Sequence, residues 1–208
     1  MKNHVCVADD FEMSPHEEAA LETTDPRLPG SLAVWLIIAA ELLTFGILFL
    51  CYAFARSQDV ALFNASQLTL NLNSGAINTV LLITGSWYVV HAVKAVQRDK
   101  SELGVRWLVA ALACGFGFIG FKVIEFSAKI DAGIDLSTNT FYMFYIMLTA
   151  FHFFHVIVAM VFLAILLVKT WQGAYGRHDY HALETGAAFW HMVDLLWIVL
   201  FPLVYVMR

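Results

Sequence analysis

Two histidines three residues apart stand within the longest uncharged stretch of the sequence. His152 and His155 belong to FHFFHV, inside residues 141–168, where no Asp, Glu, Lys or Arg occurs. An imidazole ring can bind a metal ion, transfer a proton or hydrogen-bond to a neighbouring helix. Positions i and i+3 lie on one side of a helix, so this spacing directs both rings towards the same side.

Further ionisable side chains lie inside other apolar stretches: Glu41 in AAELLTF, Glu125 in FKVIEF, and His191 with Asp194 in FWHMVDLLW. His191 and Asp194 are again three residues apart. Lys122 precedes Glu125 by the same spacing, which predicts a local ion pair near the membrane surface. A charged side chain at the centre of a membrane helix costs about 2.5–3.5 kcal/mol on insertion scales. We therefore expect these side chains to face the interior of a helix bundle and to have partners there.

Three interpretations of these side chains stay open from the residues alone. The first, which we favour, is structural: hydrogen bonds between helices, worth about 0.6 kcal/mol each on average, that fix how the helices pack. The second is a metal or haem site. Its ligand types are present, but no E-x-x-H, H-E-x-x-H or C-x-x-C spacing occurs. The third is a proton or ion path through Glu41.

The elements that must position these groups are transmembrane helices. Hydrophobic residues make up 60% of the chain and charged residues only 14%, against about 25% in soluble domains. A membrane crossing needs about 20 mostly apolar residues. The segments that satisfy this are 32–55, 75–93, 105–128, 141–168 and 186–207. The sequence thus predicts an all-α integral membrane protein with a five-helix transmembrane domain over residues 31–208.

The charges outside these helices are unevenly distributed. Residues 1–30 carry seven of the 17 acidic side chains and no apolar core of a signal peptide, which predicts an acidic, disordered tail. Five crossings place the two termini on opposite sides of the membrane. Eight Lys and Arg residues fall on the side of the N-terminus and four on the other, so the positive-inside rule predicts a cytoplasmic N-terminus. This distribution gives no basic surface for nucleic acid.

Four motifs together resemble subunit III of the haem–copper oxidase superfamily. They are AELLTFGILFLCY, FKVIEF, FHFFHV and WHMVDLLWIVLF, in the order of the chain. The resemblance extends over residues 28–208 and fits the short, five-helix form of that subunit. Many members have Gly at the position of Phe153. This difference, with the runs TNTFYMFYIMLTAFHFFHV and ETGAAFWHMVDLLW, makes the chain most similar to the accessory branch associated with bacterial nitric oxide reductase.

The resemblance implies an accessory, non-catalytic subunit of a respiratory oxidoreductase complex. Members of the family bind no haem, copper or other metal. They flank a catalytic membrane subunit that holds the haem and any non-haem metal. In the predicted branch that partner is a nitric oxide reductase of denitrification, in the bacterial cytoplasmic membrane, and the C-terminus of this chain is then periplasmic.

Alternatives remain beside this interpretation. The nearest is subunit III of an aerobic cytochrome c or quinol oxidase. From other classes come a proton-conducting channel or transporter that uses Glu41, and a free-standing membrane enzyme with its own haem or metal.

The family also implies where lipid binds. Its helices divide into a pair and a group of three around a V-shaped cleft that holds phospholipid, which here predicts that segments 32–55 and 75–93 form the pair. Glu41 matches the intramembrane carboxylate of that cleft. The other interior polar positions of the family match Glu125, His152, His155, His191 and Asp194. The resemblance therefore implies structural or lipid-cleft roles for these six side chains, with no catalytic, cofactor-binding or metal-ligating role.

Overall fold

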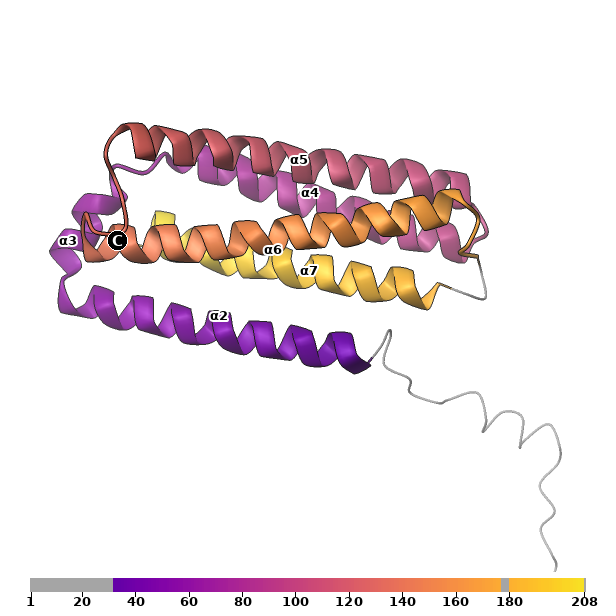
Figure 1. The fold of residues 1–208 in the computed structure, drawn as a ribbon, viewed down its shortest axis with the longest axis horizontal. Coiled ribbons are helices and arrows are strands. Elements are labelled where there is room, and N and C mark those ends of the chain that lie inside the picture. Colours follow the sequence, from indigo (N-terminus) through magenta and orange to yellow (C-terminus); the bar gives the residue numbers. More distant parts are fainter. Residues whose placement is uncertain (1–31, 177–179, 208) are drawn as a thin grey trace, which may run out of the picture.

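The computed structural model describes residues 32–176 and 180–207 (Figure 1). Its elements are α2 (Leu32–Gln58), α3 (Val60–Gln67), α4 (Leu72–Gln97), α5 (Ser101–Asp131), α6 (Thr140–Trp171), α7 (His181–Phe201) and a short π-helix, η1 (Pro202–Val206). Five of the described helices, with α7 and η1 taken as one, are long and apolar enough to cross a membrane. This confirms the predicted all-α fold with five crossings. The acidic tail predicted over residues 1–30 lies outside the described residues.

The connection between the first two crossings contains a helix that the sequence pattern did not predict. Helix α3 has only eight residues, too few for a hydrophobic period to stand out. Asp59 caps its start by accepting a hydrogen bond from the Leu62 amide at 3.0 Å. Phe63 and Gln67 are buried beneath it. Packing against the rest of the molecule therefore stabilises α3.

Polar contacts join α2, α3 and the C-terminal end of the chain. The Gln67 side-chain amide donates to the Val204 carbonyl at 3.0 Å. The Arg56 guanidinium, at the last turn of α2, donates to the Asn64 side chain at 3.0 Å and to the Met207 carbonyl. These bonds satisfy carbonyl groups at the end of the last helix, which otherwise have no partner within the helix.

The turn between α5 and α6 is organised by Asp135 and Asn139. The Asp135 carboxylate accepts hydrogen bonds from the Ser137 hydroxyl and amide and from the Thr138 hydroxyl, and these bonds hold the pKa of Asp135 below its ordinary value. Asn139 caps α6 by accepting from the Tyr142 amide at 2.9 Å. Ser137 and Thr138 precede this cap, and Asp135 engages both of their side chains.

The last crossing changes its geometry at Pro202. Proline has no amide proton, so it cannot continue the i→i−4 bonding of α7. The α-helix ends at Phe201, and the chain continues as η1, in which the Met207 amide donates to the Pro202 carbonyl at 2.9 Å. At this proline the last crossing therefore changes from an α-helix to a wider π-helix.

The helices group differently from the predicted pair and group of three. α4 packs on α5 and α7, α6 completes a four-helix bundle, and α2 lies against α6 and α7 along one edge (Figure 1). Close approach explains the α4–α5 contact: a Cβ added at Gly85 would meet Cys114 at 3.3 Å, and one added at Gly104 would meet Val96 at 2.7 Å. Helix α3 separates α2 from α4 in the chain. The first two crossings therefore do not form the predicted pair in the described residues.

Candidate functional site

Glu41 and His155 form a polar pair between α2 and α6. Their Oε2 and Nε2 atoms are 3.1 Å apart. His155 Nδ1 lies 2.8 Å from the Phe151 carbonyl of the preceding turn, which orients the ring so that Nε2 faces Glu41. The Phe45 ring packs edge-on against the imidazole at 5.4 Å between centroids. This pair attaches α2 to the bundle within the membrane, where α2 has few other polar contacts.

An apolar groove of about 430 Å³ opens beside this pair, between α2, α6 and α7. At one end are Glu41 and His155, and at the other are Lys169 and Tyr175. The walls between these ends are aliphatic and aromatic, among them Val34, Ile37, Phe154, Val158, Phe162 and Phe189. The side chain of Glu41 keeps 26% of its surface exposed at this groove. The sequence-predicted carboxylate therefore lines an apolar groove between the first crossing, α2, and the fourth and fifth crossings, α6 and α7.

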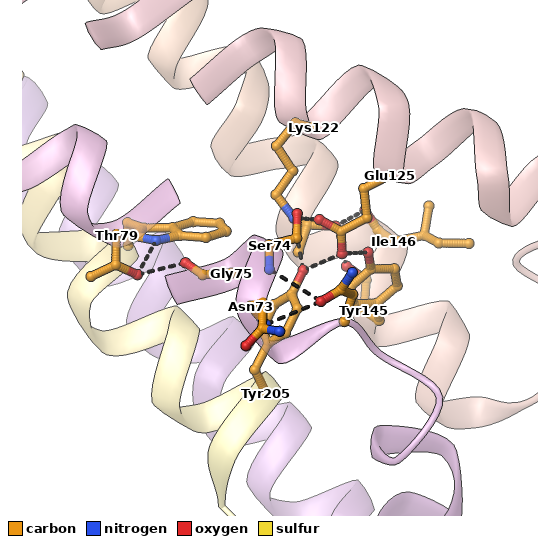
Figure 2. Close-up of polar contacts among 12 residues, drawn as sticks. Asn73, Ser74, Gly75, Thr79, Lys122, Glu125, Tyr145, Ile146 and Tyr205 are labelled. Atoms are coloured by element: carbon orange, nitrogen blue, oxygen red, sulfur yellow. Dashed lines mark hydrogen bonds and ion pairs between the residues drawn. The ribbon is translucent and has the colours of Figure 1, made fainter. Parts of the chain in front are cut away.

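Lys122 and Glu125 form a second polar cluster, inside the bundle (Figure 2). Lys122 is fully buried, and its Nζ donates to Glu125 Oε2 at 3.0 Å. The hydroxyls of Tyr145 on α6 and Tyr205 on η1 both donate to Glu125 Oε1 at 2.6 Å. The Lys122 ammonium also lies 4.9 Å from the centre of the Trp197 ring. The ion pair predicted from the i, i+3 spacing is present, but protein encloses it because three helices contribute partners.

His152 lies one turn from His155 but meets different neighbours. It is fully buried, and neither ring nitrogen has a hydrogen-bond partner among the described residues. The centroid of its ring lies 5.1 Å from that of the Trp197 ring and 5.8 Å from that of the Phe118 ring. Both histidines face the buried side of α6, as predicted. However, His152 points towards α5 and α7 while His155 points towards α2, because α6 contacts both groups of helices.

His191 and Asp194 lie where α7 packs on α4. His191 Nδ1 is 2.5 Å from the Ser86 hydroxyl, and the nearby Trp197 indole donates to the Thr79 hydroxyl at 3.0 Å. Asp194 Oδ1 is buried without a hydrogen-bond partner in the described part of the chain. Ser86 and Thr79 thus supply α4 with hydroxyl partners for side chains of α7, as is common between membrane helices.

Sequence reasoning missed the tyrosine and serine partners of the predicted site. Tyr145, Tyr205 and Ser86 carry no charge and occur in no ligand spacing, so a search for ionisable groups passes over them. A buried tyrosine hydroxyl usually finds a hydrogen-bond partner, and this was the available indication for Tyr145 and Tyr205. The structure joins two of the six predicted residues, Glu41 and His155, directly to each other. It places the remaining four with partners outside that set or with none.

The predicted side chains do not converge on one centre. Among the residues that the structure describes, no three His, Cys, Asp or Glu side chains lie close enough together to hold a metal ion. Phe153, where many members of the resembling family have Gly, packs on Phe126 of α5 at 6.0 Å between ring centroids. What the arrangement can do chemically is to join helices and to present an apolar groove with polar ends.

Five membrane-spanning helices with polar groups paired in their interior define a multi-pass helical membrane protein. The family model for cytochrome c oxidase subunit III matches residues 31–208, and the chain therefore belongs to that family. It is 30% identical over 189 residues to cytochrome c oxidase subunit 3 of Thermostichus vulcanus, with 90% of each chain covered. It is 26% identical over 176 residues to quinol oxidase subunit 3 of Bacillus subtilis, covering 85% of this chain and 86% of that one.

A longer relative comes from Aeropyrum pernix and is named heme-copper oxidase subunit I+III. It is 31% identical over 179 residues, which are 83% of this chain but only 22% of that protein. This chain thus corresponds to a small part of that relative.

Proposed function

We propose that this chain is a non-catalytic accessory subunit of a haem–copper-type oxidoreductase, and that its partner is a bacterial nitric oxide reductase of denitrification. The observation that carries the proposal is the arrangement of the interior polar groups. Glu125 accepts hydrogen bonds from Lys122, Tyr145 and Tyr205, which hold three elements together. Both carboxylate oxygens of Glu125 therefore accept hydrogen bonds that join helices. This structural role is what we expect in a subunit that stabilises a partner.

The name of one relative supports a direct partnership with the catalytic subunit. The Aeropyrum pernix protein combines subunits I and III in its name, and this chain matches part of it. We infer that this chain likewise contacts a subunit I, which holds the haem and any non-haem metal.

The choice of the nitric oxide reductase branch rests on the sequence around Phe153. Its ring occupies space between α6 and α5 that a glycine would leave to the backbone. The second candidate is subunit III of an aerobic oxidase. It is favoured by a specific observation, since the relatives named above are subunits of cytochrome c and quinol oxidases.

A phospholipid in the apolar groove is part of the proposed function. The groove is lined by α2, α6 and α7, and Lys169 at one end supplies a positive charge for a phosphate. Glu41 is then a residue of the lipid cleft, as the resemblance implies. The groove lies between one helix of the predicted pair, α2, and two helices of the predicted group of three, α6 and α7.

The proposed location is the bacterial cytoplasmic membrane with the N-terminus in the cytoplasm. The excess of Lys and Arg on that side supports this orientation. Three of the residues in that count, Lys2, Arg27 and Arg177, lie outside the described part of the chain. The other five, which the structure describes, all belong to the same side in this orientation: Lys94, Arg98, Lys100, Arg106 and Lys169.

Copurification tests the proposed partner. The tagged full chain is purified in mild detergent from cells grown with nitrate and without oxygen, and in parallel from aerated cells. We expect a haem-containing membrane subunit from the nitrate-grown cells, with nitric oxide consumption in the purified complex. An oxygen-consuming complex from aerated cells alone would replace the first candidate by the second. Purification without any haem-containing partner from either culture would contradict both.

A further inference from the structure

The groove has a polar end at a defined depth in the membrane. His155 lies at the middle of α6, 15 residues after Thr140, and Glu41 faces it from α2. Lys169 follows His155 by fourteen residues, which is about 21 Å along an α-helix. Trp171, exposed over 77% of its surface at the end of α6, suits the membrane–water interface. The polar pair therefore lies near the bilayer midplane, and Lys169 lies at the level of the head groups.

This depth matches the reach of one lipid leaflet. The hydrocarbon core is about 30 Å thick, so each leaflet contributes about 15 Å of acyl chain. A phospholipid with its phosphate at Lys169 directs one chain along Phe162, Val158 and Phe154 towards the polar pair. The end of that chain then reaches Glu41 and His155, where the chains of the leaflet end.

The polar pair disfavours a chain that extends further. Glu41 uses Oε2 for the bond to His155 and keeps part of its side chain exposed at the groove. Alkyl groups placed over this carboxyl give it no hydrogen bond and remove any water that does. Along the apolar walls, each additional methylene gains favourable contact instead. Binding should therefore improve with chain length up to the polar pair and weaken beyond it.

We propose that the Glu41–His155 pair sets an upper limit to acyl-chain length in the groove, so that the groove selects phospholipids whose chain ends at the bilayer midplane. This rests on the proposed lipid binding and adds selectivity to it. The lipids selected in this way are those of the leaflet whose head groups lie on the side of Lys169.

The experiment measures the affinity of the purified full chain for saturated phosphatidylglycerols of increasing chain length. Each lipid competes with a fluorescent phosphatidylglycerol bound to the protein. For the wild type we expect a maximum, with affinity falling about tenfold, or ~1.4 kcal/mol, once the chain overruns the pair. In the Glu41→Leu/His155→Leu double variant, the longest chains should bind as well as those at the maximum. Dividing wild-type by variant affinities cancels differences in lipid solubility.

Two controls separate this proposal from lipid binding itself. Thr149→Val removes a polar group from the same helix; its hydroxyl bonds the Tyr145 carbonyl and does not line the groove, so the maximum should stay. Lys169→Gln should lower the affinity for phosphatidylglycerols of every chain length by the same factor. Binding without any dependence on length, or a maximum that persists in the double variant, would overturn the length limit and leave lipid binding intact. No displaceable phosphatidylglycerol at any length would overturn both.

A measurement on the wild type covers the case in which the double variant does not fold. A phosphatidylglycerol with a photoreactive group at its chain end is bound and illuminated, and the labelled peptides are identified by mass spectrometry. We expect labels around Ile37, Glu41 and Phe154 for a chain of the preferred length, and around Phe162 for a shorter one. Labels distributed over the outer surface of α5 would contradict the proposal.

Discussion

The two polar pairs of the membrane domain, Lys122–Glu125 and Glu41–His155, differ in how completely the protein surrounds them. Lys122 and Glu125 are enclosed by the bundle. Glu125 accepts hydrogen bonds from the hydroxyls of Tyr145 and Tyr205, and Lys122 donates to the Tyr205 hydroxyl. Glu41 and His155 connect α2 to the bundle, and Glu41 remains partly open to an apolar groove. The difference shows that one fold can use one carboxylate to fix its core and another at a partly open, apolar groove.

The largest expected effect is the loss of one partner in the enclosed pair. Glu125→Leu leaves the Lys122 ammonium buried without its counter-charge, and we expect the free energy of unfolding to fall by about 3–5 kcal/mol. Denaturant unfolding of the full chain in detergent micelles measures this. The double variant Lys122→Met/Glu125→Leu should recover a large part of the loss. A single-variant loss no greater than that of Glu41→Leu would remove the contrast between the pairs.

Substitutions of Gly85 in the bundle and of Gly46 on α2 compare how tightly the protein packs around these two regions. A Cβ at Gly85 would meet the Trp190 ring at 3.2 Å, whereas one at Gly46 would meet nothing within 4 Å. We expect Gly85→Leu to destabilise by about 1–3 kcal/mol through overpacking. Gly46→Leu should change stability by less, because its side chain extends into open space. The same unfolding assay compares the two, and equal losses would show that α2 is packed as tightly as the bundle.

Removal of the pair at the groove should have a smaller effect. We expect Glu41→Leu to cost about 0.6–1.7 kcal/mol, the range of a hydrogen bond between membrane helices. Glu41→Gln keeps a hydrogen-bonding group towards His155 and should cost less. Hydrogen exchange followed by mass spectrometry should place the increased exchange in α2. Increased exchange throughout α4 and α5 would mean that the pair holds the bundle as well.

The smallest effect is expected at His152. Its ring nitrogens have no partner among the described residues, and aromatic rings surround it. His152→Phe removes no hydrogen bond to another described residue and gains apolar contact, so the free energy of unfolding should change by no more than about 0.5 kcal/mol. His155→Phe loses the bond to Glu41 and should be the more destabilising of the two. A reversed order in the unfolding assay would contradict the roles assigned to these histidines.

Much of the fold could be predicted, because lipid imposes a simple requirement. A helix that crosses the membrane must be long and apolar, so each crossing is visible in the sequence by itself. The i, i+3 spacing also predicted the Lys122–Glu125 bond correctly, since both partners lie on one helix. Partners on different helices were not predictable in this way. Nothing near Glu125 in the sequence indicates Tyr205, which is 80 residues away.

The sequence by itself determined the five crossings, their interior polar side chains and membership of the family, because hydrophobicity and motifs are local properties of the chain. Only the tertiary structure decided how these parts combine. In the tertiary structure α2 packs beside α6 and α7, and Glu41 contacts His155. His152 lies among aromatic rings, and the groove forms between α2, α6 and α7. Between apolar helices lipid offers no hydrophobic preference for one neighbour over another, so close packing at small residues and a few hydrogen bonds select the arrangement.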